Sequence, residues 1–180
     1  MIPMFHSMTS WRQYAVVVSY LSENQIFLLA EHSTQYKDDG SSSFYKLVKA
    51  REYQAKMEDY MKALGMKTLT IQGELCAPGI QQNRLRLTKP EWYVFTIREN
   101  GKRVGLKRML QICEALDITP VPIEEVGTDL PSKYPTVEAL LSRADGEYPN
   151  GGKKEGTFLS LVEFLYEKSD CPLWTIAVFR

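Results

Sequence analysis

Apolar residues recur in this chain with two different spacings, and the order of those spacings limits the possible folds more than any other feature. Aliphatic runs at 15–21 and 26–30, separated by polar Ser-Glu-Asn, predict a hairpin. From Tyr45 to Leu64 the spacing is helical, and Gly65 is placed to end that helix. The alternating pattern of a strand returns at 68–71. Because strands and helices are mixed and hairpin signals dominate, the sequence predicts an α+β fold.

The second half of the chain continues this mixture. Residues 91–97 alternate as a strand that places Tyr93, Phe95 and Ile97 on one face, and 99–103 predict a turn. Residues 121–123 predict a short strand, and 144–156 form a glycine-rich loop. Two further helices are indicated by apolar stripes, the second of which is expected to face inward: Leu106, Met109, Leu110, Cys113 and Leu116, then Val137, Leu140, Leu141 and Ala144. Without a repeat or a long linker, residues 1–180 are predicted to form one domain.

Charge and cysteine content limit the classes of partner. Lys plus Arg and Asp plus Glu each number 22, so the chain has no overall positive charge of the kind that indicates a nucleic-acid binder. A local basic groove is still compatible with a net charge of zero. Cys76, Cys113 and Cys171 lack metal-binding spacing and are typical of reduced thiols. The longest apolar stretch, Tyr14–Leu21, is too short to cross a bilayer. We therefore expect a cytoplasmic protein without a membrane partner.

The segment 37–40, Lys-Asp-Asp-Gly, matches a short pattern in which the lysine of ATP-dependent ligases and capping enzymes attacks the nucleotide. Such a lysine should follow a buried strand and precede an alternating one. Residues 31–36 are polar instead, and the predicted helix follows, with Ser42 or Ser43 as its N-cap. Lys37 is therefore predicted to be a turn residue rather than a nucleophile.

Three longer segments carry a more specific signal: 71–85 (IQGELCAPGIQQNRL), 93–97 (YVFTI) and 144–156 (ADGEYPNGGKKEG). In this order they resemble the nucleotidyltransferase domain of ATP-dependent RNA ligases, in the group that contains the second RNA ligase of phage T4. The resemblance covers roughly residues 31–156. It implies an ATP-grasp-like fold with antiparallel sheets and flanking helices, ATP and Mg²⁺ as cofactors, and RNA ends as partners. AMP would pass from a lysine to an RNA 5′-phosphate, and an RNA 3′-hydroxyl would then displace it.

The same resemblance implies roles for three residues. Glu74 matches a glutamate that contacts the ribose, and Phe95 matches an aromatic that stacks on adenine, with Tyr93 as the alternative. Glu155 matches an acidic residue near the nucleotide and the metal. Each position also has an ordinary explanation: a surface glutamate, a core aromatic and a solvated loop residue. No role is assigned to four nearby cations, Lys102, Arg103, Lys153 and Lys154.

Departures from the family pattern place the activity itself in question. Trp11 stands where the reactive lysine is expected, His32 stands where the family has an arginine, and 172–180 lack the lysine of a later motif. These features predict a partial or diverged ligase domain over 1–180. Two other interpretations remain open: a non-catalytic module that binds nucleotide or RNA ends, and a protein-interaction domain without a nucleotide site. DNA is an alternative to RNA.

Overall fold

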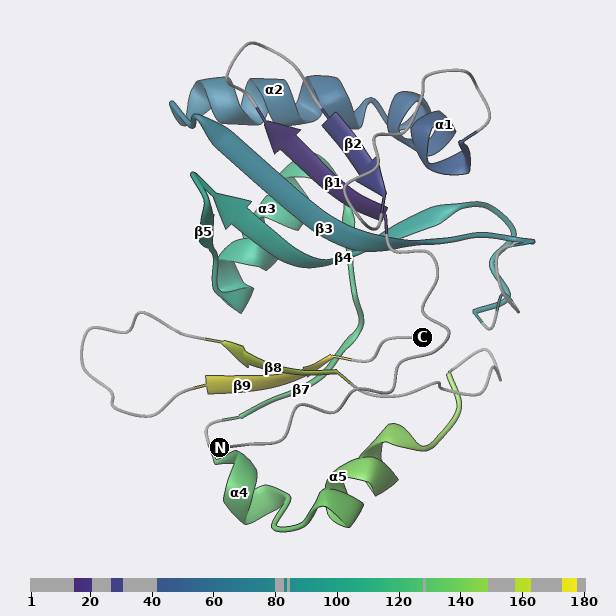
Figure 1. The fold of residues 1–180 in the computed structure, drawn as a ribbon, viewed down its shortest axis with the longest axis vertical. Coiled ribbons are helices and arrows are strands. Elements are labelled where there is room, and N and C mark those ends of the chain that lie inside the picture. The colour runs from purple at the N-terminus through teal and green to yellow at the C-terminus, as the bar shows by residue number, and fades with distance from the viewer. Residues whose placement is uncertain are drawn as a thin grey trace.

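The structure is a computed structural model that describes residues 15–20, 27–30, 42–79, 83, 85–127, 129–148, 158–162 and 173–177, with the backbone alone for its first two and last two strands. Helices and two sheets are mixed along the chain, so the predicted α+β class is confirmed (Figure 1). None of the helices in the described ranges is long and apolar enough to cross a membrane.

The larger sheet has the strand order β2-β1-β3-β4-β5, and β6 pairs with β4. Its strands are β1 (Ala15–Tyr20), β2 (Phe27–Ala30), β3 (Thr68–Cys76), β4 (Glu91–Glu99), β5 (Lys102–Arg103) and β6 (Thr119–Pro120). All of these pairs are antiparallel except β4 with β6. The smaller, antiparallel sheet has the order β7-β9-β8, formed by β7 (Ile123–Gly127), β8 (Phe158–Val162) and β9 (Leu173–Ala177).

Five helices complete the described fold: α1 (Ser43–Ala50), α2 (Tyr53–Ala63), α3 (Leu106–Leu116), α4 (Leu130–Lys133) and α5 (Val137–Ala144). Figure 1 shows the smaller sheet between the larger sheet and the helices α4 and α5. Helices α1, α2 and α3 share one buried core with β3 and β4. One face of the larger sheet is therefore covered by helices, and its other face is turned toward the smaller sheet.

The single helix predicted over 45–64 is wrong, because the structure divides it into α1 and α2. Glu52 takes a left-handed conformation at φ 55° between them. At 100° per residue, a continuous helix would place Tyr53 roughly 180° from Phe44. Phe44 and Tyr53 are both buried in the core, so the break turns the second apolar stripe back toward the sheet.

The predicted helix ends are confirmed. The Ser42 hydroxyl accepts a hydrogen bond from the Tyr45 amide at 3.2 Å and caps α1. Gly65 has φ +62°, and the Met66 amide donates to the Met61 carbonyl at 2.9 Å, which together form the Schellman turn expected of a terminal glycine.

Two predictions in the second half need correction. The strand predicted at 121–123 lies between β6 and β7, and of its residues Ile123 alone is in a strand, because the chain crosses there from one sheet to the other. Helix α5 forms at the predicted residues, but Val137 and Leu141 do not face inward: they are 67% and 61% exposed. Spacing predicts that a helix has an apolar face, whereas tertiary structure decides whether another layer covers it.

Stability should fall at alkaline pH. Burial raises the pKa of Tyr53 to about 12 and the pKa of the Cys113 thiol to about 12. In the unfolded chain these groups ionise near pH 10 and 9, so above about pH 9 the unfolded state loses protons that the folded state keeps. The free energy of unfolding should therefore decrease between about pH 9 and 12, and it should decrease less steeply in Cys113→Ala. Urea denaturation at a series of pH values measures this, and equal slopes in wild type and variant would contradict the assignment.

Candidate functional site

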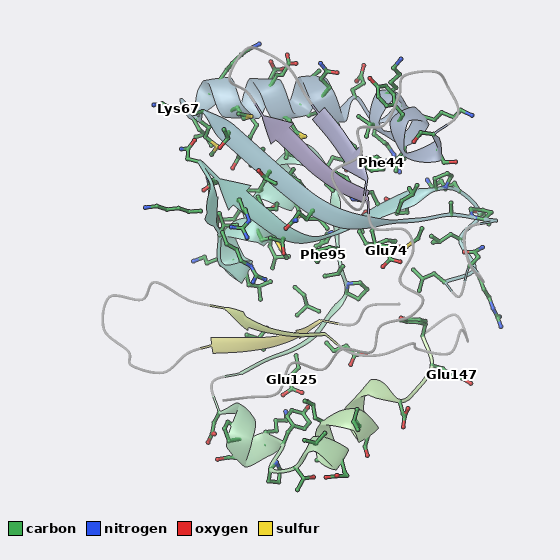
Figure 2. All side chains as sticks on the ribbon, viewed as in Figure 1. Phe44, Lys67, Glu74, Phe95, Glu125 and Glu147 are labelled. Carbon is green, nitrogen blue, oxygen red and sulfur yellow. The ribbon has the colours of Figure 1, made fainter. Side chains whose placement is uncertain are left out.

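Two of the predicted nucleotide-binding residues, Glu74 and Phe95, lie on the face of the larger sheet that the helices leave uncovered. Alternation along β3 directs Leu69, Ile71 and Leu75 into the helical core. Gln72 and Glu74 therefore point the other way, toward the smaller sheet. In Figure 2 the Glu74 and Phe95 side chains lie on this side of the sheet, whereas Phe44 lies among the helices.

Glu74 is 7% exposed and is the one charged side chain that is buried among those described. An ionised carboxylate is costly to remove from water and is retained in such a place where it has a specific interaction to make. Its position is set by pairing with Tyr93 across β3 and β4. A buried carboxylate beside an aromatic ring on a sheet face can accept hydrogen bonds from hydroxyl groups.

Phe95 occupies a β-bulge. Gln72 pairs with Thr96 and Gly73 pairs with Val94, so Phe95 is the additional residue on β4. A bulge redirects the side chains that follow it. Because of this extra residue, Val94 and Ile97 both enter the core although they are three residues apart. Phe95 remains on the opposite face with Tyr93. The prediction that Ile97 shares a face with Tyr93 and Phe95 is therefore wrong, because simple alternation does not account for the extra residue.

The structure thus brings Glu74 and Phe95 to one face of adjacent strands, with Tyr93 beside them. Gln72 belongs to the same face and was missed by the sequence reasoning, although counting back two residues from Glu74 would have found it. The remaining predicted residues, Glu155, Lys37, Lys153, Lys154, Trp11 and His32, lie outside the described residues. Lys102 and Arg103 form β5, at the edge of the sheet.

A metal centre made by protein groups alone is not found in the described ranges, where no group of three or more His, Cys, Asp or Glu side chains gathers. Mg²⁺ commonly needs no such group, because one or two carboxylates plus substrate phosphates bind it. A cavity of about 340 Å³ lies elsewhere, between α1 and α2, and shares no residue with the Glu74 face. The chemistry that the described face can offer is recognition of a base and of sugar hydroxyls.

Solved structures of an RNA ligase from Naegleria gruberi have a similar fold. A variant with ATP and Mn superposes with a TM-score of 0.65 over 82% of this chain, at 20% sequence identity. The ligase with pyrophosphate gives a TM-score of 0.62, and a second variant with ATP and Mn gives 0.63, both over 98% of this chain and at 20% identity. The chain spans about half of the length of these ligases, between 43% and 57%.

No protein-family model matches the sequence, and no curated protein matches it. The comparisons therefore show an RNA ligase-like fold, which agrees with the resemblance in the sequence.

Proposed function

We propose that this chain is an RNA ligase-like protein that binds ATP on the larger sheet, between its two sheets. The observation that carries the proposal is the placement of Glu74 and Phe95 on one face of adjacent strands, within a fold similar to that of an RNA ligase solved with ATP and Mn. At the finer level, we propose an ATP-grasp-like nucleotidyltransferase domain, of which residues 1–180 form a single, partial copy.

In this proposal Phe95 stacks on the adenine, and the Glu74 carboxylate accepts hydrogen bonds from the ribose hydroxyls. The β-bulge supports the first role, because it holds the Phe95 ring out of the core. Burial supports the second role, since a carboxylate in a water-poor site makes stronger hydrogen bonds than one in water. Tyr93 is the alternative stacking partner. Glu155 is proposed to lie near Mg²⁺, which would neutralise charge on the phosphates.

The joining of RNA ends is the activity that the fold supports best. A non-catalytic role in binding nucleotide or RNA ends is the second candidate, because the sequence predicts Lys37, five residues before the α1 N-cap Ser42, to be a turn residue rather than a nucleophile. Formation of a covalent lysyl-AMP distinguishes the two candidates.

ATP binding can be tested by thermal denaturation. ATP in large excess should raise the melting temperature of the wild-type protein. Glu74→Gln and Phe95→Leu should each weaken binding about tenfold, which removes about 1.4 kcal/mol of stabilisation at the same ATP concentration. Glu114→Gln, at an exposed site on α3, is the matched control and should behave as wild type. Equal stabilisation of all four proteins by ATP would contradict the assigned site.

Covalent adenylylation is tested with radiolabelled ATP and Mg²⁺ or Mn²⁺, followed by denaturing electrophoresis. We expect no label on wild type or on Lys37→Ala, because the sequence predicts Lys37 to be a turn residue that lacks the flanking strands of a nucleophile motif. Label that appears on wild type and is lost in Lys37→Ala would instead identify Lys37 as the nucleophile and establish the catalytic candidate.

A further inference from the structure

Basic side chains are concentrated in one short segment of this otherwise neutral chain. Residues 98–108 contain five Lys or Arg side chains and a single carboxylate, Glu99, although the formal net charge of the whole chain is zero. Four of the five are exposed or largely so, and they cover the β4–β5 hairpin and the first turn of α3: Arg98, Lys102, Arg103 and Lys107. This local charge lies at the edge of the larger sheet.

Strand register sorts these cations onto the two faces of the sheet. Arg98 pairs with Thr70 on one side and with Arg103 on the other. Thr70 alternates with Gln72 and Glu74, so both arginines belong to the face that carries Glu74. Lys102 pairs with Glu99 on the opposite face, where Glu99 forms a 2.7 Å ion pair with Arg108 of α3.

Two arginines directly opposite each other on neighbouring strands are unfavourable, because like charges repel at this spacing. Arg98 donates a 3.4 Å hydrogen bond to the Gly101 carbonyl, which uses one of its five N–H groups. Both arginines are exposed, so their guanidinium groups can reach a ligand. Two exposed arginines on one face of neighbouring strands present concentrated positive charge, which suits an anionic ligand.

We propose that Arg98 and Arg103 bind the phosphate backbone of an RNA strand whose end reaches the Glu74 face. Thr70 lies four residues from Glu74 along β3, which is about 13 Å in an extended strand. The arginine pair thus lies farther along β3 than Glu74, toward the Thr70 end of the strand, and on the same face as the proposed nucleotide position. Arginine forks match phosphate oxygens two at a time, which suits a phosphodiester backbone. This inference rests on the proposed function for its RNA substrate.

Binding is measured by fluorescence anisotropy with a labelled single-stranded RNA that carries a 5′-phosphate, over a series of salt concentrations. The variant with both Arg98→Ala and Arg103→Ala should bind about tenfold more weakly, and the slope of log affinity against log salt should decrease by about 1.4, as expected for two lost phosphate contacts. Lys102→Ala is the matched control, since it removes one cation from the same hairpin but from the other face. Its affinity should change less than twofold.

Two further readouts separate the possible outcomes. Removing the arginine pair should leave the melting temperature nearly unchanged, as expected for two exposed side chains; a clearly lower value would indicate a structural role and overturn the proposal. Equal losses of RNA affinity in Lys102→Ala and Arg103→Ala would overturn the proposal, because they would show that any positive charge on this hairpin attracts RNA equally. If ATP stabilises the protein but RNA does not bind, the RNA surface is wrong and the ATP site stands. If RNA binding depends on the arginines while ATP gives no stabilisation, the RNA surface stands and the ATP site is wrong.

Discussion

Replacing Trp92 with alanine is expected to lower the free energy of unfolding by about 4 kcal/mol, because it removes the largest fully buried side chain among the described residues. Trp92 is 1% exposed. Its ring meets Phe44 edge-on with centroids 5.3 Å apart and lies 5.8 Å from the ring of Tyr53. These contacts join α1, α2 and β4, so the cavity left by alanine would lie where three elements meet.

Trp92→Phe tests how much of the expected loss of stability comes from the volume of the side chain and how much from its polar N–H group. The indole Nε1 is buried and has no hydrogen-bond partner among the described residues, so removing its N–H leaves no acceptor unsatisfied there. Phenylalanine should therefore cost only about 1–2 kcal/mol. Urea denaturation followed by circular dichroism measures both variants. A Trp92→Ala protein within about 1 kcal/mol of wild type would show that this aromatic cluster is not central to stability.

Local patterns were enough to predict much of the framework. The stripe from Leu106 to Leu116 forms α3 at the expected residues, and Ser42 and Gly65 end their helices as predicted. Such features depend on hydrogen bonds and spacing within a few residues, which the sequence displays directly. The alternating runs likewise became strands, although β3 and β4 extend beyond their predicted ends because each is paired along its length.

Features that depend on distant partners were not predictable in the same way. The break at Glu52 is understood only when Phe44 and Tyr53 must meet the same sheet. The bulge at Phe95 depends on how β4 aligns with β3, which is separated from it by a connection of 14 residues, 77–90. For the site, the common face of Glu74 and Phe95 emerged from this pairing, while their contacts with nucleotide and the role of Glu155 stay predictions.

Replacing Gly73 with alanine is expected to destabilise the protein by about 3 kcal/mol, because the structure leaves no space for a side chain there. An added Cβ would lie 2.4 Å from Trp92 Nε1 and 2.5 Å from the Tyr93 carbonyl oxygen. The first neighbour belongs to a fully buried ring and the second to the backbone of a paired strand, so neither can move easily. The strand would have to shift at the residue before Glu74.

Gly101→Ala provides the contrasting control. Gly101 has φ +81° and open space around it, so alanine there meets only the strain of a left-handed conformation, about 1 kcal/mol. Adding Trp92→Phe to Gly73→Ala should recover part of the lost stability, because it removes the indole N–H group but not the Tyr93 carbonyl. Urea denaturation of the single and double variants measures this coupling.

The same substitution links the core to the site. In Gly-Glu-Leu, Gly73 lets the indole approach the strand, Glu74 points to the opposite face and Leu75 returns to the core. A shift of β3 at Gly73 would therefore move the Glu74 carboxylate relative to Phe95. We expect Gly73→Ala to lose the ATP-dependent rise in melting temperature as well as stability, whereas Gly101→Ala should keep that rise. A Gly73→Ala protein that ATP stabilises as much as wild type would show that the position of Glu74 does not depend on this close packing.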